Sequence, residues 1–392
     1  MKVVFKLAFR NLVGAGLRTW LNVIVLSFSF IAIIWSQGVY EGMSAQAAQS
    51  LKDAEYGGGQ YWHEEYDPYN PLTLEKAHGA LPAPLQRLIE ERRAMAILII
   101  QGTLYPQGRF LPVIIKGIDS GQNILLFPSK FLNNGGEDEI PALIGTRMAR
   151  STGLRVGDVV TLRFRDSQGA FDARNIRIVH IMSTTVQSID QGQVWLPLST
   201  LRSLAGMEQE ATLVTLGKGT NFSERIPGWS YKSLDFLLQD IHELVRSKTV
   251  GSTIFYLILI LLALLALFDT QVLSIFRRRK EIGTLMAMGM SRAKIIQLFT
   301  LEGALHSLLA ALVAAVYGFP LLGIFARKGW AMPQAIDSYG FAIGERIFPI
   351  YSAGLILGTA ILVMLVTTLV SFLPTRRIAK LKPTDALRGR IS

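Results

Sequence analysis

The sequence predicts a membrane protein with four transmembrane α-helices and a large α+β extracytoplasmic domain inserted between the first and second helices. Two observations predict this fold class. Half of the 392 residues are hydrophobic, and they gather in four runs of about twenty or more, the length that a helix needs to cross a hydrocarbon layer of roughly 30 Å. A long segment of balanced charge separates the first run from the second.

The four apolar runs predict transmembrane segments at residues 19–40, 249–276, 295–325 and 349–373. The other predicted segments are an interfacial helix at 1–18, the outer domain with its stalk helices at 41–248, a loop at 277–294, a short outer loop at 326–348 and a tail at 374–392.

The distribution of positive charge predicts which side of the membrane each loop occupies. Sixteen of the 40 Lys and Arg residues lie in the first 18 residues, the 277–294 loop and the tail, whereas residues 41–248 hold 21 Lys and Arg against 23 Asp and Glu. Since short cationic loops stay in the cytoplasm, we expect both termini and the 277–294 loop inside and the large domain outside. This bias accounts for the net charge of +11, so nucleic acid is not an expected partner.

The N-terminal segment allows two interpretations. Its cations recur at a spacing of four and its apolar residues fall on the opposite side, which is typical of a helix lying on a membrane surface: Lys2, Lys6 and Arg10 against Phe5, Ala8, Phe9 and Leu12. Alternatively, residues 1–47 are a cleaved signal peptide ending at Ala47. An apolar run nearer twenty residues than ten favours a spanning helix.

The outer domain is expected to contain both strands and helices. Residues 42–55 prolong the first span, and 56–73 form a loop rich in glycine, proline and aromatic residues. Alternating patterns predict neighbouring strands at 96–105 and 109–119, a hairpin from 156–166 and 174–184, and strands at 193–198 and 211–216. A short helix is predicted at 142–154, with Gly153 as its C-cap. Another is predicted after an N-cap at Ser199-Thr200, and a second stalk helix from Ser233.

No motif for enzyme catalysis is present, and a non-catalytic chain without its own cofactor is expected. The sequence lacks the phosphate-binding pattern G-x-x-x-x-G-K-[ST], the zinc pattern H-E-x-x-H and the nucleophile pattern G-x-S-x-G. There is no cysteine, which excludes disulfides and cysteine metal sites. His63, Glu64, Glu65 and Asp67 lie close in sequence, but their spacing matches no metal geometry, and a solvated polar loop is the favoured interpretation.

Three ionisable residues lie inside the predicted spans: Asp269, Glu302 and His306. Charged groups at this depth are costly and usually face protein or water, so each is a candidate functional residue. Glu302 and His306 are one helical turn apart and can pair on one face. Two interpretations stay open: a structural polar cluster that joins the second and third spans, or a relay for protons or substrate.

The loop "RRRKEIGTLMAMGMSRAKI" (277–295) predicts a short helix lying flat at the cytoplasmic surface. Its four leading cations are expected among anionic headgroups. Ile282, Leu285, Met286 and Gly289 give a narrow apolar face, while Gly289 can close the helix and Ser291 can begin the next one. A plain connector would not need an exposed apolar face, so this face is predicted to contact another protein.

Two motifs resemble one known family. The same loop is similar to the R-R-x-E-I-G-x-x-x-A-x-G signature of ABC-transporter permeases of the MacB/FtsX-like (type VII, mechanotransmission) superfamily. The tail "PTRRIAKLKPTDALR" (374–388) resembles that family's ending, P-x-x-x-A-x-x-x-P-x-x-A-L-R. The pattern of "VGDVVTL" followed by "QVWLPLSTLRSLAG" looks closest to lipoprotein-releasing permeases of the LolC/LolE type.

The resemblance implies a mechanism and a set of partners. The 277–294 loop becomes a coupling helix docked on a separate cytoplasmic ATPase, present in two copies, which carries ATP and Mg²⁺. The matching positions are Glu281, Ile282, Gly283, Leu285, Met286, Ala287 and Gly289 in the loop, and Pro374, Arg376, Arg377, Pro383, Ala386, Leu387 and Arg388 in the tail. A second permease, either a copy or a paralogue, completes a dimer in the bacterial cytoplasmic (inner) membrane.

The resemblance leaves three functions open. The first is release of lipoproteins from the membrane, which implies a lipoprotein substrate and a periplasmic carrier. The second is MacB-like efflux of drugs or peptides. The third is FtsX-like regulation of a cell-wall hydrolase, although the outer domain of such regulators is typically smaller than the one predicted here.

Overall fold

The computed structural model describes the chain apart from residues 1–4, 9, 11–13, 15, 135–138, 185, 221, 332–345 and 379–392. The chain divides into two compact units. One, the helical unit, comprises residues 1–43, 244–331 and 346–392; the other, the sheet unit, comprises residues 44–243 and 332–345.

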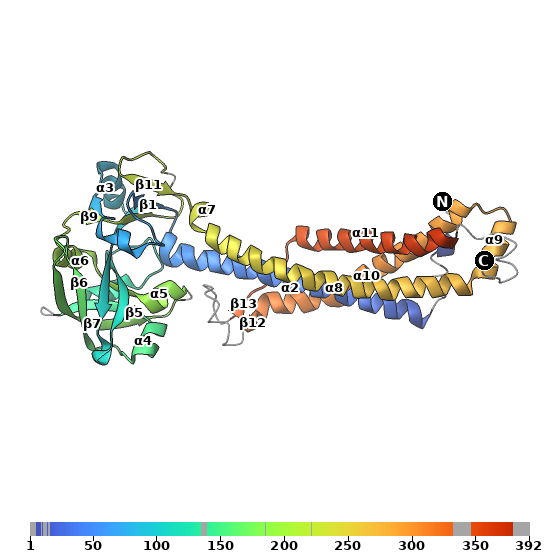
Figure 1. Cartoon of the computed structure of the whole chain (residues 1–392), viewed down its shortest axis with the longest axis horizontal. Helices are drawn as coiled ribbons and strands as arrows, with labels where there is room; N and C mark the ends of the chain where they lie inside the picture. Colours follow the sequence, from blue (N-terminus) through green and yellow to red (C-terminus); the bar gives the residue numbers. More distant parts are fainter. Residues whose placement is uncertain are drawn as a thin grey trace. The chain divides into compact units, whose positions relative to one another are not determined.

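Long helices form the helical unit. In the described part of the chain, four helices are long and apolar enough to cross a membrane. They belong to α2 (Leu17–Leu51), α8 (Gln239–Arg277), α10 (Arg292–Lys328) and α11 (Ala353–Ile378) (Figure 1). The sheet unit is inserted between the first of these helices and the other three, which confirms the predicted fold class.

Apolar side chains and small residues hold the helices of this unit together. Val23 and Phe30 of α2, Ala310 of α10 and Val363 of α11 belong to one buried cluster. A Cβ atom added at Gly303 of α10 would overlap the Ser371 side chain of α11. Small residues at such points let helix backbones approach closely, which drives helix association in membranes.

Short elements join the long helices. Helix α9 (Arg279–Ala287) connects α8 with α10, and strands β12 (Trp330–Ala331) and β13 (Arg346–Ile347) pair with each other between α10 and α11. Helix α2 continues into a π-helical turn at Lys52–Tyr56, and α7 (Leu234–Leu237) precedes α8.

The sheet unit is built on a mixed sheet. In the described residues its strand order is β11-β1-β10-β3-β4-β8-β5-β7-β6, and β6 pairs again with β3. The bounds are β1 Gln60–His63, β3 Ala94–Leu104, β4 Leu111–Ile118, β5 Ile140–Gly145, β6 Val159–Arg165, β7 Phe171–Met182, β8 Gln193–Pro197, β10 Leu213–Leu216 and β11 Trp229–Lys232. Because β3 pairs with both β4 and β6, six strands close into a ring: β3, β4, β8, β5, β7 and β6. The first residues of β3 also pair with β10, which extends the sheet through β1 to β11.

The two faces of β3 belong to two different cores, because its side chains alternate. Leu98 and Ile100 belong to a cluster with residues of β4, β5, β6, β7 and β8. Ile97 and Ile99 belong to a second cluster that includes Leu51. The smaller pair β2 (Gly79–Ala80) and β9 (Glu210–Ala211) and the helices α3 (Ala83–Glu90), α4 (Thr146–Thr152), α5 (Gln187–Gly192) and α6 (Leu198–Ala205) complete the unit.

Several strand and helix predictions are confirmed, and three need correction. The 96–105/109–119 neighbours and the 156–166/174–184 hairpin are formed as β3–β4 and β6–β7. The 56–73 segment was expected as loop but contains β1, because two neighbouring strands supply its hydrogen bonds. The helix after β8 begins at Leu198 with Pro197 as its N-cap, so Ser199 is not a cap. The helix ending at Gly153 is preceded by β5 rather than by further helix.

Candidate functional site

The predicted coupling segment forms helix α9. Its end is a closed turn in which Gly289 has a φ of 92°, a left-handed conformation that glycine adopts without strain. Met290 N–H donates to the Leu285 carbonyl at 3.0 Å, and Gly289 N–H donates to the Met286 carbonyl at 3.1 Å. These two bonds are those of a Schellman motif, so the sequence fixes where α9 ends.

The predicted apolar face of α9 is covered in part by the chain itself: Ile282 is buried, Leu285 and Met286 are half-buried, and Gly289 is exposed. Ile282 is 1% exposed and belongs to a cluster with Ile275 of α8 and Phe299 of α10, against which Met286 also packs. The expectation of an exposed face was therefore wrong for Ile282, because the connector is short enough to fold back onto the helices that it joins. Contact of the other face residues with another protein stays a prediction. Among the described side chains of α9 and the turn after it, the exposed residues are Lys280, Glu281, Thr284, Ala287, Met288 and Gly289.

Arg278 links α9 to α10. Its Nε donates to Glu281 Oε2 at 2.8 Å, an Nη donates to Glu302 Oε2 at 3.4 Å, and its guanidinium lies 5.5 Å from the ring centre of Phe299. The leading cations were expected among lipid headgroups, but Arg278 is used inside the protein. This role of Arg278 could have been predicted from Glu302, because a carboxylate inside an apolar helix usually pairs with a nearby cation.

The three ionisable residues of the spans do not form one group. Glu302 and His306 are both 4% exposed, and His306 Nδ1 donates to the backbone carbonyl of Glu302 at 2.8 Å rather than to its carboxylate. Asp269 is exposed on the surface of α8. The buried pair of α10 is thus connected to the α9 region through Arg278, whereas Asp269 stands apart.

The tail residues are described in part. Pro374, Arg376 and Arg377 lie in the last turns of α11. Pro383, Ala386, Leu387 and Arg388 lie outside the described residues.

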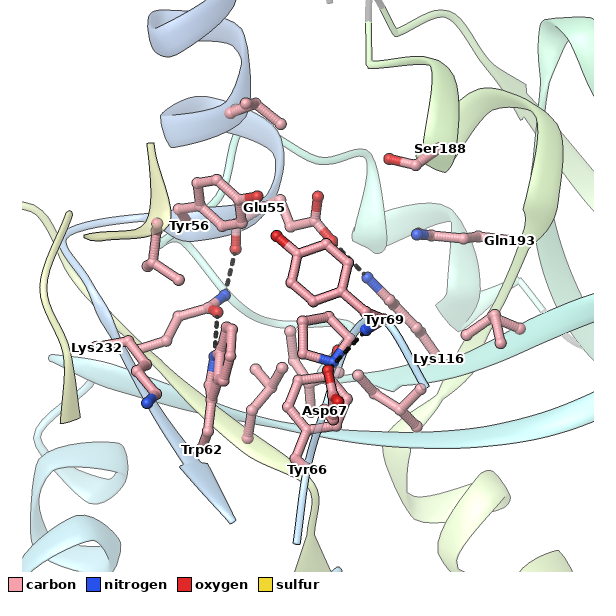
Figure 2. A pocket seen from close by; sticks show the side chains of 18 of the residues that line it. Glu55, Tyr56, Trp62, Tyr66, Asp67, Tyr69, Lys116, Ser188, Gln193 and Lys232 are labelled. Carbon is pink, nitrogen blue, oxygen red and sulfur yellow. Dashed lines mark hydrogen bonds and ion pairs between the residues drawn. The ribbon is translucent and has the colours of Figure 1, made fainter. Parts of the chain in front are cut away.

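A large cavity of about 1090 Å³ lies within the sheet unit, and sequence reasoning missed it. Its wall is aromatic, with Tyr56, Trp62, Tyr66, Tyr69 and Phe236 among the lining residues (Figure 2). The sequence signal was the aromatic-rich 56–73 segment, which reads as loop. The cavity is not visible from that segment alone, because β3, β4 and the start of α8 complete its lining.

Two lysines and two tyrosines define the electrostatics of this cavity. Lys116 pairs with Glu55 at 2.7 Å, and Lys232 lies over the rings of Trp62 and Phe236 at 5.4 Å and 4.9 Å. The hydrogen bond that the Tyr69 hydroxyl donates to Asp240, together with burial, raises the pKa of Tyr69 to about 12. Burial and the nearby Glu55 and Asp67 carboxylates raise the pKa of Tyr66, so both phenols stay neutral.

A known family model matches most of the long helices that follow the sheet unit in the sequence. The family model for the FtsX-like permease C-terminal domain matches residues 253–383, which include the end of α8 and all of α9 and α10. Over residues 253–383 the chain is therefore similar to an FtsX-like permease domain. The buried Glu302, the Arg278 link and the Gly289 turn all lie within this FtsX-like permease domain.

Curated relatives extend the similarity beyond this domain. An uncharacterized ABC transporter permease of Methanocaldococcus jannaschii is 27% identical over 257 residues, covering 60% of this chain and 58% of that protein. Macrolide export ATP-binding/permease proteins MacB from Burkholderia lata and Escherichia coli O157:H7 are 24% and 26% identical; they match 57% and 69% of this chain and 30% and 37% of their own lengths. The chain therefore spans less than two thirds of each of these relatives.

One solved structure is also similar. The extracellular domain of the noncanonic ABC-type transporter YknZ from Gram-positive bacteria covers 42% of this chain and 83% of its own, with 13% identity and a TM-score of 0.27. A TM-score this low does not establish a common fold for the two domains.

Proposed function

We propose that this chain is the permease subunit of an ABC transporter, in which a separate cytoplasmic ATPase drives movements of the extracytoplasmic domain. The observation that carries the proposal is the arrangement of α9 in the FtsX-like permease domain. One side of α9 is fixed to α8 and α10 through Ile282 and Arg278, and the other side is exposed at Thr284 and Met288. A helix held in this way can transmit a push from a bound partner to both neighbouring helices.

The proposal includes an orientation and a stoichiometry. Both termini and α9 lie in the cytoplasm, the sheet unit lies outside, and two permeases assemble with two ATPase subunits. The charge balance between the two sides supports this orientation. ATP and Mg²⁺ are held by the ATPase, because the permease chain has no phosphate-binding loop pattern of its own.

For the cargo we propose release of lipoproteins from the membrane, on the resemblance of the β6 and β8–α6 segments to Lol-type permeases. Export of a small molecule or peptide is the second candidate, and the names of the MacB relatives favour it. Regulation of a cell-wall hydrolase is the third.

The test replaces an exposed residue of α9. Met288 is 71% exposed, so Met288→Glu should leave the helices folded while it weakens docking of the ATPase. Val156 is 58% exposed in the sheet unit, and Val156→Glu is the matched control. We expect gentle affinity purification of the full-length protein to recover an ABC ATPase with wild type and with Val156→Glu, and several-fold less with Met288→Glu. Equal recovery with both variants would refute docking on α9.

The proteins that accompany the complex distinguish the cargoes. Acylated lipoproteins or a soluble lipoprotein carrier would support release, a membrane-fusion protein would support export, and a peptidoglycan hydrolase would support regulation. Purification of an intact permease dimer without any ATPase would overturn the proposal as a whole.

A further inference from the structure

The cavity of the sheet unit has the size and lining of a small-molecule site. Ligand pockets typically measure about 300–1,000 Å³ and have mostly apolar walls with a few placed polar groups, and this cavity measures about 1090 Å³. Its aromatic wall is held in place by Gln60, which accepts a hydrogen bond from Trp62 Nε1 at 2.8 Å and donates to the Glu55 carbonyl at 2.9 Å. These hydrogen bonds fix the orientation of the Trp62 ring in the cavity wall.

Several polar side chains of the cavity are acceptors. Gln193 is 7% exposed, and its Oε1 is buried without a hydrogen-bond partner. The nitrogen end of its carboxamide points toward the cavity (Figure 2). Asp67 and Asp240 also line the cavity, and among the described residues neither makes an ion pair. Asp67 accepts the Tyr69 N–H at 2.9 Å, and Asp240 accepts the Tyr69 hydroxyl. Each carboxylate keeps lone pairs for a further donor.

The two cations of the cavity are already engaged. Lys116 is 7% exposed at its side chain and pairs with Glu55, and Lys232 is held over two aromatic rings. The position of Lys232 also shows that these rings accept a cation at their faces, as aromatic quadrupoles do. The raised pKa values of Tyr66 and Tyr69, in part caused by nearby carboxylates, agree with a negative potential in this region.

We propose that this pocket binds an amphipathic organic amine in its protonated form. The ammonium group donates to Asp67 and Asp240, the apolar body lies against Trp62 and Tyr66, and a further polar group of the ligand reaches the carboxamide of Gln193. Aromatic faces and unpaired carboxylates together favour a cation, and both would repel an anion of the same shape. This inference concerns ligand binding by the sheet unit and does not depend on coupling to an ATPase.

The test compares three probes that share one body: 4-phenylbutylamine, 4-phenylbutanol and 4-phenylbutyrate. At pH 7 they are a cation, a neutral molecule and an anion. Binding to the full-length protein in lipid nanodiscs is followed by saturation-transfer NMR, with empty nanodiscs as the blank. We expect the amine to bind at least about tenfold more tightly than the alcohol and the carboxylate to bind more weakly than either.

Variants then locate the site. Asp240→Asn keeps the shape and removes the charge, so it should weaken binding of the amine about tenfold and leave binding of the alcohol unchanged. Asp172→Asn is the matched control, since Asp172 pairs with Arg174 and does not line the cavity. Should Asp240→Asn disturb the fold, Asp67→Asn measures the same charge selectivity. Equal binding of amine and alcohol, tighter binding of the carboxylate, or an amine affinity that neither pocket variant changes would each overturn the proposal.

Discussion

The contact between Gly303 of α10 and Ser371 of α11 is expected to control packing in the helical unit. Ser371 is fully buried and its Oγ donates to the Thr367 carbonyl at 2.8 Å. A Cβ at position 303 would overlap both Oγ and Cβ of Ser371, whereas the next atom, Nε2 of Gln271, is at an ordinary 3.6 Å. Gly303→Ala therefore requires α10 and α11 to move apart.

The expected cost follows from two opposing effects. Overpacking a filled site costs about 1–3 kcal/mol, and alanine recovers up to about 1 kcal/mol over glycine in a helix. With the full gain realised, the net loss is about 0–2 kcal/mol. Because the added atom would overlap two atoms of a fully buried side chain, we expect the upper part of this range, which corresponds to a factor of up to about 30 in the folding equilibrium. Gly323→Ala in the same helix meets nothing within 4 Å and should be neutral or slightly stabilising.

The assay heats the purified protein in detergent and measures the fraction that remains monodisperse at each temperature. Gly303→Ala should lose its folded form at a lower temperature than wild type, and Gly323→Ala should not. Ser371→Gly removes both overlapping atoms, so Gly303→Ala with Ser371→Gly should regain most of the loss, whereas Ser371→Ala keeps the Cβ and should regain less. A Gly303→Ala protein as stable as Gly323→Ala, or a loss that Ser371→Gly does not relieve, would refute the packing argument.

Two further predictions concern the sheet unit. Burial and the neighbouring His78 lower the pKa of His63 below its ordinary 6.5, so the unfolded chain binds a proton at this residue more readily than the folded protein does. The free energy of unfolding should therefore fall as pH drops from about 6.5 toward the lowered pKa. In denaturant titrations at pH 5 to 8, His63→Gln should flatten that dependence. Asp190 is 2% exposed and accepts hydrogen bonds from the backbone N–H groups of Thr146 and Arg147 at 2.7 Å and 3.0 Å. Asp190→Asn should therefore lower the free energy of unfolding, measured by denaturant titration, by about 1.5–3 kcal/mol. A change within the scatter of repeated titrations would contradict this.

The sequence predicted best the features that depend on local pattern. The four apolar helices follow from length and hydropathy, and the end of α9 follows from Gly289, which alone in that turn adopts a left-handed φ at no cost. The hairpin of β6 and β7 follows from alternation. Each of these signals lies within a few consecutive residues, so no knowledge of distant contacts is needed.

The features that sequence could not predict depend on which distant residues meet. Strand β1 looks like loop until β10 and β11 are placed on either side of it. The aromatic cavity draws its lining from segments almost two hundred residues apart, from Leu51 to Ile241. Ring closure between β3 and β6 has no local signal, because the pairing uses the same side-chain alternation as every other strand pair.

The burial of Ile282 changes how the α9 signature should be interpreted. A narrow apolar stripe on a short connector predicts either contact with a partner or contact with the chain's own helices, and periodicity is identical in the two cases. Ile282 contributes to the second, together with Ile275 and Phe299. Its burial therefore supports an anchoring role, and under the proposed function the exposed Thr284 and Met288 are the residues expected to contact the partner. Substitution at Ile282 should then loosen α9 from its neighbours, whereas under the proposed docking substitution at Met288 should weaken only ATPase binding. Comparing the two variants separates anchoring from docking.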